Sequence, residues 1–516
     1  MSTISPTVLV VGAGPVGLVA AGELARHGVA VRIIDKLTVP TDESRAIAVH
    51  ARSLDMLARM GVVDQLIETG VQSKGMDLRS GHELLVRVPL DSVDSAYAFS
   101  LNTPQTETER VLTEHLTALG VTIERGVELT GLDQDADAVH LTLQHADGTV
   151  ENVTVPWVIG ADGAHSTVRH LVGGKLEGTF VGERFLLGDV DATHDLDPES
   201  MFTFFAADGP VLAMPMRHGR TRIMAQIHDA PGTPLNLHPT VADLQRVIDQ
   251  RVGGITIDRA HWMTSFELHH AQVSQYRWGR VFLAGDTAHI HSPAGGQGMN
   301  TGMQDAFNLV WKLAAVSTGQ AGEAVLDSYQ AERYPVAKSM IEFTDRLSKV
   351  GTLTGTPQHV RNAALKLLSH VGPVPRAMAN LTAEVKVAYP DSPIVADHHP
   401  HGAKVTAGEH FPYLGDNDVQ KYFPGCWGVG HSTVTVAAGH GVPAAGRAGQ
   451  QILVTDTDAP VAGYDVVIAD PDRVAASRLG LPDGGRVVVR PDTYIGAIAA
   501  LDDSDTVAAY FAAMSR

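Results

Sequence analysis

The sequence has only one cysteine, Cys426, among 516 residues. A single thiol excludes an internal disulfide, a zinc site built from cysteines and a redox centre of two thiols. Such sparing use of cysteine is typical of a protein that works in the reducing cytoplasm, which is where we expect it. An uninterrupted apolar run of membrane-spanning length is also missing, so we expect no transmembrane helix.

Positive charge is scarce as well. Lys and Arg number 39 against 58 Asp and Glu, which gives a formal net charge of -19. Because nucleic acids and anionic membrane surfaces attract basic proteins, we expect neither as a partner. The apolar stretch 7–21 lacks a basic leader and carries glycines at a fingerprint spacing, so we interpret it as part of the fold and not as a signal peptide.

What the sequence does contain fits a turn-rich α/β protein of two or three domains, with 44% hydrophobic residues, 51 glycines and 27 prolines. An apolar strand over 8–11, a helix over 15–27 and a second strand over 29–34 form the first βαβ unit of a doubly wound sheet. Period-two alternation from about 176 to 275 predicts an inserted antiparallel sheet.

The later part of the chain changes character twice. Apolar residues after Asn300 recur at helical spacing, and helical segments continue to about 385. Short β-type runs follow at 451–455, 466–468 and 486–490, and we expect a final helix over about 495–514. The resulting prediction is a Rossmann-like domain over 1–75, 101–175 and 276–350, an inserted β-sheet domain over 76–100 and 176–275, a helical connector over 351–394, and a separate small α/β domain over 395–516.

The first motif that carries chemistry is Gly12-Ala-Gly14-Pro15-Val-Gly17 between a strand and a helix. Its glycines permit a tight turn, close approach of backbone to a pyrophosphate, and close packing of helix on strand. Asp35 ends the second strand, 18 residues past Gly17, where it can accept from an adenosine ribose hydroxyl. The motif predicts dinucleotide binding without separating FAD from NAD.

The second motif, Gly160-Ala-Asp162-Gly163 followed by Arg169, comes directly after an apolar strand. By itself Asp162 is best explained as a helix cap, but together with the other motifs it indicates part of a nucleotide cleft.

The third motif begins with a strand over 281–284 and the pair Gly285-Asp286, then a Gly/Pro loop opens a long helix. In open α/β sheets ligands dock where strands end, and the Asp286 carboxylate can accept from ribityl hydroxyls. The loop 293–298 can present N–H groups and a helix N-terminus to the negative charge of a reduced flavin. The alternative is a plain turn with a capping Asp.

Together the three motifs resemble the single-component FAD aromatic hydroxylases of the para-hydroxybenzoate hydroxylase type, over nearly the whole chain. The resemblance implies non-covalently bound FAD, NAD(P)H as a transient co-substrate, and O2 that hydroxylates a small phenolic or polyketide-like substrate through a flavin C4a-hydroperoxide. It also implies that the Rossmann-like domain binds FAD, that the sheet domain over 76–100 and 176–275 binds the substrate, and that 395–516 is the thioredoxin-like domain of the larger members. With Cys426 alone we expect that domain to be structural or to form a homodimer. The cofactor-binding residues carried over are Gly12, Gly14, Pro15, Gly17, Asp35, Lys36, Arg45, Gln105, Asp162, Asp286, Pro293, Gly298, Met299 and Asn300.

Alternatives remain open. The same fold can perform a Baeyer–Villiger oxidation, an epoxidation or the inactivation of an antibiotic, and a flavoprotein without turnover that acts as a scaffold belongs to a different class. We name no catalytic base. We expect no metal, since His289-Ile-His291 and the cluster at 398–401 lack further ligands at fixed spacing. Arg217 and His218 are better explained as a surface turn than as pocket lining, and Phe204, Phe205, Trp262 and Phe266 as core.

Overall fold

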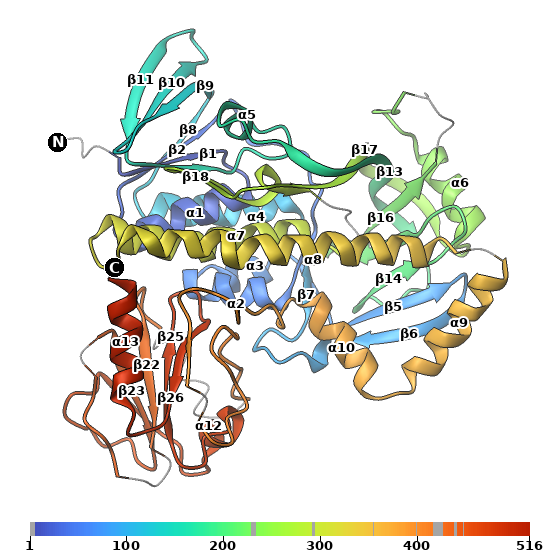
Figure 1. The fold of residues 1–516 in the computed structure, drawn as a ribbon. Coiled ribbons are helices and arrows are strands. Elements are labelled where there is room, and N and C mark those ends of the chain that lie inside the picture. The colour runs from blue at the N-terminus through green and yellow to red at the C-terminus, as the bar shows by residue number, and fades with distance from the viewer. Residues whose placement is uncertain are drawn as a thin grey trace.

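The computed structural model describes residues 6–228, 234–290, 295–353, 355–398, 400–415, 427–437, 441–446 and 448–515. Cys426, His291, Pro293 and His399 therefore lie outside the described residues. Three bodies are visible in Figure 1: a sheet-and-helix body at the left, a curved sheet with its own helices at the right, and a C-terminal domain at the lower left.

The N-terminal body is built on a sheet in the order β18-β19-β12-β1-β2-β8. The strands from β19 to β8 run parallel, and β18 pairs antiparallel with β19. All four residues of β1 are buried, as expected for a parallel strand covered on both faces. The elements are β1 (Val8–Val11), β2 (Val31–Asp35), β8 (Ile123–Arg125), β12 (Trp157–Gly160), β18 (Arg277–Trp278) and β19 (Val281–Leu283), with helices α1 (Pro15–Arg26), α4 (Gln105–Ala118) and α7 (Gly298–Ser317).

Smaller elements complete this body. A meander in the order β11-β10-β9 and a short sheet in the order β3-β7-β4 flank the main sheet. They comprise β3 (Ala48–Val49), β4 (Val71–Ser73), β7 (Ser100–Asn102), β9 (Val127–Gln134), β10 (Val139–His145) and β11 (Val150–Val155), with α2 (Ala51–Met60), α3 (Val63–Ile67), α5 (Thr167–Leu171), η3 (Gly285–Thr287) and η4 (Glu323–Leu326).

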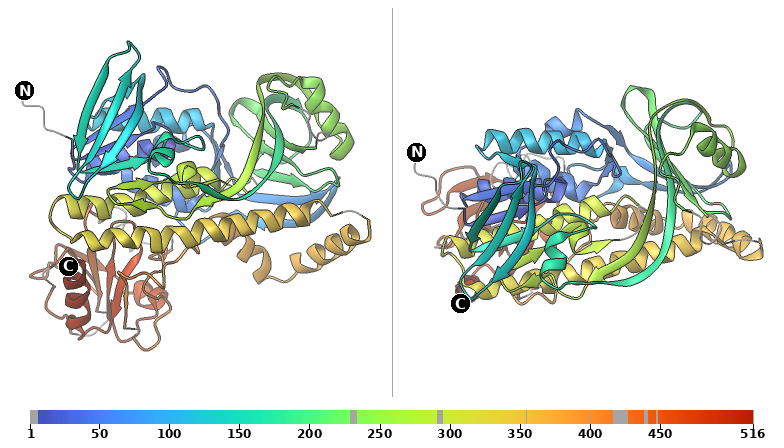
Figure 2. Two further views of the ribbon diagram at one scale, coloured as in Figure 1. Left: turned by 45° about the horizontal axis from the view of Figure 1, so that its top comes forward. Right: turned by 90° about the horizontal axis from the view of Figure 1, so that it is seen from above.

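The second body is an eight-stranded sheet in the order β20-β17-β13-β16-β15-β14-β5-β6. Two strands of 18 residues, β13 and β17, link it to the N-terminal body, and Figure 2 shows them side by side. Helix α6 covers one face through Leu244 and Ile248. The elements are β5 (Gly75–Ser80), β6 (Glu83–Pro89), β13 (Leu176–Thr193), β14 (Ser200–Phe204), β15 (Val211–Pro215), β16 (Arg220–Ile227), β17 (Thr256–Val273), β20 (His289–Ile290), η1 (Leu90–Ser92), η2 (Arg217–Gly219) and α6 (Val241–Arg251).

Three helices follow α7 and η4. Helix α8 (Asp327–Gly351) runs from the N-terminal body to the second sheet, and α9 (Gly355–Ser369) and α10 (Pro373–Thr382) return over β6 (Figure 2). No helix within the described ranges is both long and apolar enough to span a membrane.

The C-terminal domain holds a sheet in the order β21-β26-β25-β22-β23-β24. Strands β22 and β23 are parallel, and β25 is antiparallel to both its neighbours, the mixed sheet of a thioredoxin-like fold. The elements are β21 (Ala396–Asp397), β22 (Ser432–Val436), β23 (Gln450–Thr455), β24 (Val466–Ala469), α12 (Val474–Leu479), β25 (Gly485–Val489), β26 (Ile495–Ala499) and α13 (Ser504–Met514).

The predicted final helix over 495–514 is wrong in its first part. Ile495–Ala499 is strand β26, and the helix begins only at Ser504, where the Asp503 side chain accepts from the Thr506 N–H at 3.0 Å. Short runs of small apolar residues fit a strand or a helix equally well, and here pairing with β25 decides.

A buried charge cluster joins the C-terminal domain to the N-terminal body. Arg490 donates two hydrogen bonds to Glu332 of α8, at 2.7 and 2.9 Å, and its Nε donates to Asp492 at 3.0 Å. The Lys312 Nζ on α7 lies 2.7 Å from Glu332, and all four side chains are fully buried. Burial opposes ionisation of Glu332, but Arg490 and Lys312 outweigh it and hold its pKa well below the usual range.

Candidate functional site

The three sequence motifs converge at the carboxyl edge of the parallel sheet. The Ala161 N–H donates to the Val11 carbonyl at 2.8 Å, which places the second motif beside the first. Thr287, directly after Asp286, joins the second motif to the third: its Oγ1 accepts from the Gly163 N–H at 3.0 Å and donates to Asp162 at 3.2 Å. Residues separated by more than 270 positions thus form one site.

The glycines of the first motif meet different surroundings. A Cβ on Gly12, whose φ is +103°, would lie 2.3 Å from the Ala161 oxygen, and a Cβ on Gly17 would lie 1.9 Å from the Gly12 oxygen. A Cβ on Gly14 would meet no atom within 4 Å. Gly12 and Gly17 are therefore required by the turn itself, whereas Gly14 leaves space at the N-terminus of α1. A diphosphate fits such a cradle.

A cleft of about 260 Å³ opens beside this cradle. Six of the predicted cofactor-binding residues line it: Gly12, Gly14, Asp35, Lys36, Gln105 and Asp162. The Asp35 carboxylate accepts from the Ala13 N–H at 2.7 Å and from the Leu37 N–H at 2.8 Å, which fixes it at the cleft. Pro15 is buried as the first residue of α1.

Asp162 does cap a helix. It accepts from the backbone N–H groups of Thr167 and Val168 at the start of α5, at 2.7 and 3.1 Å. Arg169 is 4% exposed and donates to the carbonyls of Ala164 and Thr287, so it braces the second motif against the third. Capping and a place in the cleft therefore coexist at Asp162.

Asp286 lies in the turn η3 after β19. An α7 side chain anchors that turn, since Asp305 accepts from the Gly285 N–H at 3.1 Å. The Asp286 side chain is exposed, and no donor among the described residues binds it. Desolvation by the surrounding protein atoms raises its pKa, with His289 and Arg45 opposing. The turn thus presents a carboxylate that can accept hydrogen bonds from a ligand.

Asp305 is also the centre of a buried network. The His289 Nε2 lies 2.7 Å from it, and the Arg333 Nε donates to it at 2.6 Å. Burial opposes its ionisation, but Arg333 and His289 together lower its pKa. His289 therefore helps to order the turn through Asp305.

The loop that carries Arg45 is held from two sides. The Gln105 N–H donates to Ser44 Oγ at 3.0 Å, and its Oε1 accepts from the Ala46 N–H at 3.3 Å. From the second sheet, the fully buried Arg222 donates to Ser44 Oγ at 3.0 Å and to the Ala46 carbonyl at 3.0 Å. Arg45 itself is exposed and paired with Glu43.

At the start of α7, Gly298 and Met299 are half-buried and Asn300 is fully buried. The Asn300 side chain is used within the protein: its Oδ1 accepts from the His50 N–H at 2.9 Å, and its Nδ2 donates to the carbonyls of Ala48 and Gly296. Asn300 thus shapes the loop before α7 instead of projecting from it.

Other residues weighed in the sequence are now placed. Arg217 and His218 are exposed in η2, as a surface turn predicts, while Phe204 and Phe205 are core. Sequence reasoning missed Arg222, Thr287 and His50. A signal for Arg222 existed, because a charged residue within the alternating strand 221–227 is unusual unless it is paired.

Comparison with known proteins decides the family. The family model described as the FAD binding domain matches residues 5–344, and that described as the phenol hydroxylase C-terminal dimerisation domain matches 471–516. The 6-methylpretetramide 4-monooxygenase of Streptomyces rimosus is 35% identical, over 99% of this chain and 93% of its own length. The chain belongs to the FAD-dependent aromatic hydroxylases.

Two further relatives agree. The rifampicin monooxygenase of Streptomyces venezuelae is 38% identical, over 70% of this chain and 75% of its own length. The solved structure of the anhydrotetracycline hydroxylase OxyS from Streptomyces rimosus matches with a TM-score of 0.75 and 28% identity, covering 99% of both chains. The predicted family, the α/β fold class, the enzymatic activity and FAD as cofactor are confirmed. The substrate sheet is antiparallel except where β14 pairs parallel with β5. NAD(P)H is the co-substrate typical of the family.

The glycine cradle makes a testable prediction. Gly14→Ala should leave the melting temperature of the apoprotein unchanged, because φ at Gly14 is -78° and the added Cβ meets nothing. The methyl group would occupy the space expected for the diphosphate, so we expect FAD to bind at least about tenfold more weakly, or about 1.4 kcal/mol. Gly17→Ala should instead lower the melting temperature. Thermal melting and FAD titration of both variants check this; equal melting of the two would contradict it.

Proposed function

We propose that this enzyme hydroxylates a multi-ring phenolic compound of the polyketide type, bound between the second sheet and the flavin. The observation that carries the proposal is an apolar wall on the face of that sheet opposite α6. Arg222 lies on this face and reaches the loop of Ser44 and Ala46, so the face is directed toward the FAD-binding body.

The wall extends over four strands. Thr264, Leu187, Met224 and Leu212 form one row across β17, β13, β16 and β15, by the register of the strands. The neighbouring row holds Phe266 and Phe185, whose stacked rings lie 5.7 Å apart. Leu187, Met224, Phe185 and Phe266 are buried, whereas Trp262 and Leu212 remain partly exposed at the surface of the wall. Three strand spacings amount to about 14 Å. A single phenol ring contacts one or two of these strands, whereas several fused rings cover the wall.

Nine of the fourteen predicted cofactor-binding residues then have a direct role in the proposal, and the other five shape the cradle and cleft around them. Asp35 accepts from the adenosine ribose, Gly14 and the N-terminus of α1 face the diphosphate, and Asp286 accepts from the ribityl hydroxyls. Gly298, Met299 and Asn300 line the flavin ring or shape the loop beside it, and the sequence places Pro293 with them. Gln105 lines the same cleft and holds the loop that carries Arg45. The domain division given above stays part of the proposal.

When bound, FAD would supply the redox chemistry, namely acceptance of hydride from NAD(P)H and transfer of one oxygen atom of O2 to an electron-rich ring carbon while the other leaves as water. The chain supplies orientation, exclusion of water by the apolar wall, and backbone N–H groups at the start of α7 for negative charge on the flavin.

A substrate panel tests the proposal. NADPH oxidation and product mass are measured with single-ring phenols and with multi-ring polyketides. We expect multi-ring compounds to stimulate NADPH oxidation and to gain one oxygen atom, and single-ring phenols to have little effect. Efficient hydroxylation of single-ring phenols alone would overturn the substrate class.

Antibiotic inactivation is a second candidate, favoured by the likeness to a rifampicin monooxygenase. Rifampicin therefore belongs on the same panel. An oxygenated rifampicin product, with no turnover of other polyketides, would support this candidate over the first.

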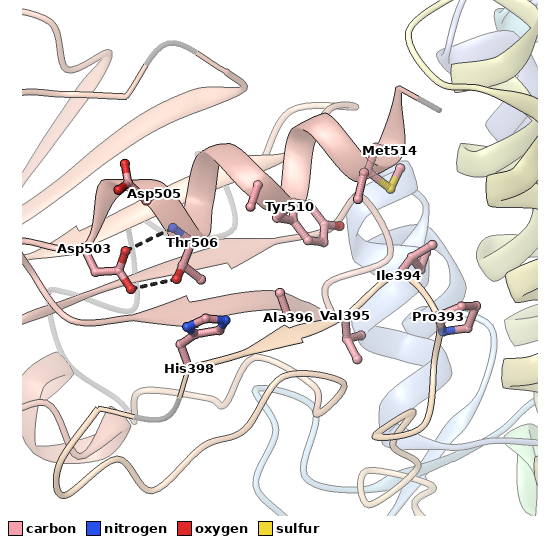
Figure 3. Close-up of a pocket in the computed structure, with 12 residues that line it drawn as sticks. Pro393, Ile394, Val395, Ala396, His398, Asp503, Asp505, Thr506, Tyr510 and Met514 are labelled. Atoms are coloured by element: carbon pink, nitrogen blue, oxygen red, sulfur yellow. Dashed lines mark hydrogen bonds between the residues drawn. The ribbon is translucent and has the colours of Figure 1, made fainter.

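A homodimer through the C-terminal domain is also proposed. A pocket of about 440 Å³ lies between α13 and the edge strand β21. Figure 3 shows Ile394, Tyr510 and Met514 among the largely apolar side chains that line it. It lies within the domain, part of which matches the dimerisation family model. Light scattering of the purified protein measures the mass, and a monomer at all concentrations would contradict the dimer. The cytoplasmic location stays a prediction.

A further inference from the structure

His50 lies between β3 and α2, beneath the loop that precedes α7. It occupies the N-cap position of α2, but its side chain makes no capping hydrogen bond. The imidazole instead points at the loop: Nε2 lies 2.7 Å from the Gly295 carbonyl oxygen, and Nδ1 lies 3.1 Å from Ser100 Oγ. The residue is 1% exposed. Its side chain therefore interacts with the loop before α7 and not with the N-terminus of α2.

The partners determine the tautomer. A carbonyl oxygen only accepts, so Nε2 must carry the proton and donate to Gly295. In the neutral ring Nδ1 then accepts, and the Ser100 hydroxyl donates to it. Burial lowers the pKa of His50 to about 4, against the opposing effect of the Gly295 hydrogen bond, so the ring is neutral at physiological pH.

The same side of the loop is held a second time by Asn300. Its Nδ2 donates to the Gly296 carbonyl at 2.8 Å, while its Oδ1 accepts from the His50 N–H. Gly295 and Gly296 both have positive φ, at +86° and +68°, which allows two successive carbonyls to turn toward β3. A Cβ on Gly296 would lie 3.0 Å from the Ala48 Cβ, so the loop also packs closely on β3.

Peptide geometry gives the consequence. In a trans peptide the C=O of one residue and the N–H of the next point in opposite directions. With the carbonyls of Gly295 and Gly296 turned toward His50 and Asn300, the N–H groups of Gly296 and Gln297 point away from β3. Together with the first turn of α7 they form a group of backbone donors on the opposite side of the loop.

We propose that His50 is a positioning residue for the flavin: through the Gly295 carbonyl it orients the peptides whose N–H groups stabilise negative charge on the pyrimidine edge of the ring. The inference rests on the flavin placement proposed above. It acts on cofactor reduction, because the negative charge develops as hydride arrives.

Three variants test it. His50→Gln places an amide N–H near the position of Nε2, whereas His50→Asn cannot reach Gly295 and His50→Met fills the space without a donor. We expect His50→Asn and His50→Met to lower the flavin reduction potential and to slow anaerobic reduction by NADPH about tenfold, the effect of one weakened donor. His50→Gln should keep both close to the wild-type values. The exposed His140→Asn on β10 serves as control and should change neither.

The outcomes separate the two proposals. If the wild-type protein binds FAD and is reduced by NADPH, but His50→Asn and His50→Met match it in potential and rate, the role of His50 is wrong and the flavin placement stands. If Asp286→Ala binds FAD as tightly as the wild type, the placement itself fails. If His50→Asn fails to fold, the reduction potential and reduction rate of His50→Gln are compared with those of His50→Met, with both variants shown to melt at the same temperature. Equal values for these two variants would contradict the role of His50.

Discussion

Asp286→Ala is expected to lose FAD while the apoprotein keeps its fold. The carboxylate has no donor among the described residues, and desolvation raises its pKa. A raised pKa in the folded state means that the ionised carboxylate disfavours folding, and this penalty grows as pH rises through that pKa. Removing the group therefore leaves the apoprotein at least as stable at neutral pH.

The bound cofactor responds in the opposite way. A carboxylate that accepts from ribityl hydroxyls contributes about 1.5–3 kcal/mol per hydrogen bond, so its loss should weaken FAD binding by about 10- to 100-fold. Titration of the apoprotein with FAD and thermal melting measure the two effects. Asp133→Ala, an exposed carboxylate on β9, is the matched control and should bind FAD normally. An FAD affinity of Asp286→Ala equal to that of the wild type would show that the ribityl chain lies elsewhere.

Arg490→Met is expected to cause a large loss of stability. The substitution removes the main partner of the buried carboxylates Glu332 and Asp492 and leaves Lys312 as the nearest cation of the cluster. Removing one member of a buried ion pair costs about 3–5 kcal/mol, because an uncompensated charge stays buried. The packing of the guanidinium over Trp311, at 5.1 Å, is lost as well.

Chemical denaturation of Arg490→Met and of Arg110→Met measures this effect. Arg110 is exposed on α4 and bridges Glu107 and Glu114, so its loss should cost less than about 1 kcal/mol. Limited proteolysis should release the C-terminal domain faster only in the Arg490 variant. Similar stabilities for the two variants would show that the buried cluster does not hold the domain in place.

The sequence predicted the parts of the site that are local along the chain. The glycines at 12, 14 and 17 and the acid at 35 lie within one βαβ unit, where spacing alone fixes their relative positions. Prediction from the sequence was less reliable where the same residues are compatible with two local structures. Asp162 was interpreted both as a cap and as part of the cleft, and the strand Ile495–Ala499 was predicted as helix. Strand β22, with its alternating Ser432–Val436, was not anticipated.

By itself, the sequence determined the family and the cofactor through three motifs, and it predicted the strand-turn-helix units expected to bind FAD, because each motif is a short stretch of chain with fixed spacing. Tertiary structure decided what crosses between units. Three contacts join residues far apart in the chain: Arg222 donates to Ser44 in the loop that carries Arg45, Thr287 donates to Asp162, and Arg490 pairs with Glu332 on α8. The same holds for His50 and Gly295, which are separated by 245 positions. Hydrophobic periodicity along the chain does not predict such contacts, since they form only when the sheets and helices pack together in the tertiary structure.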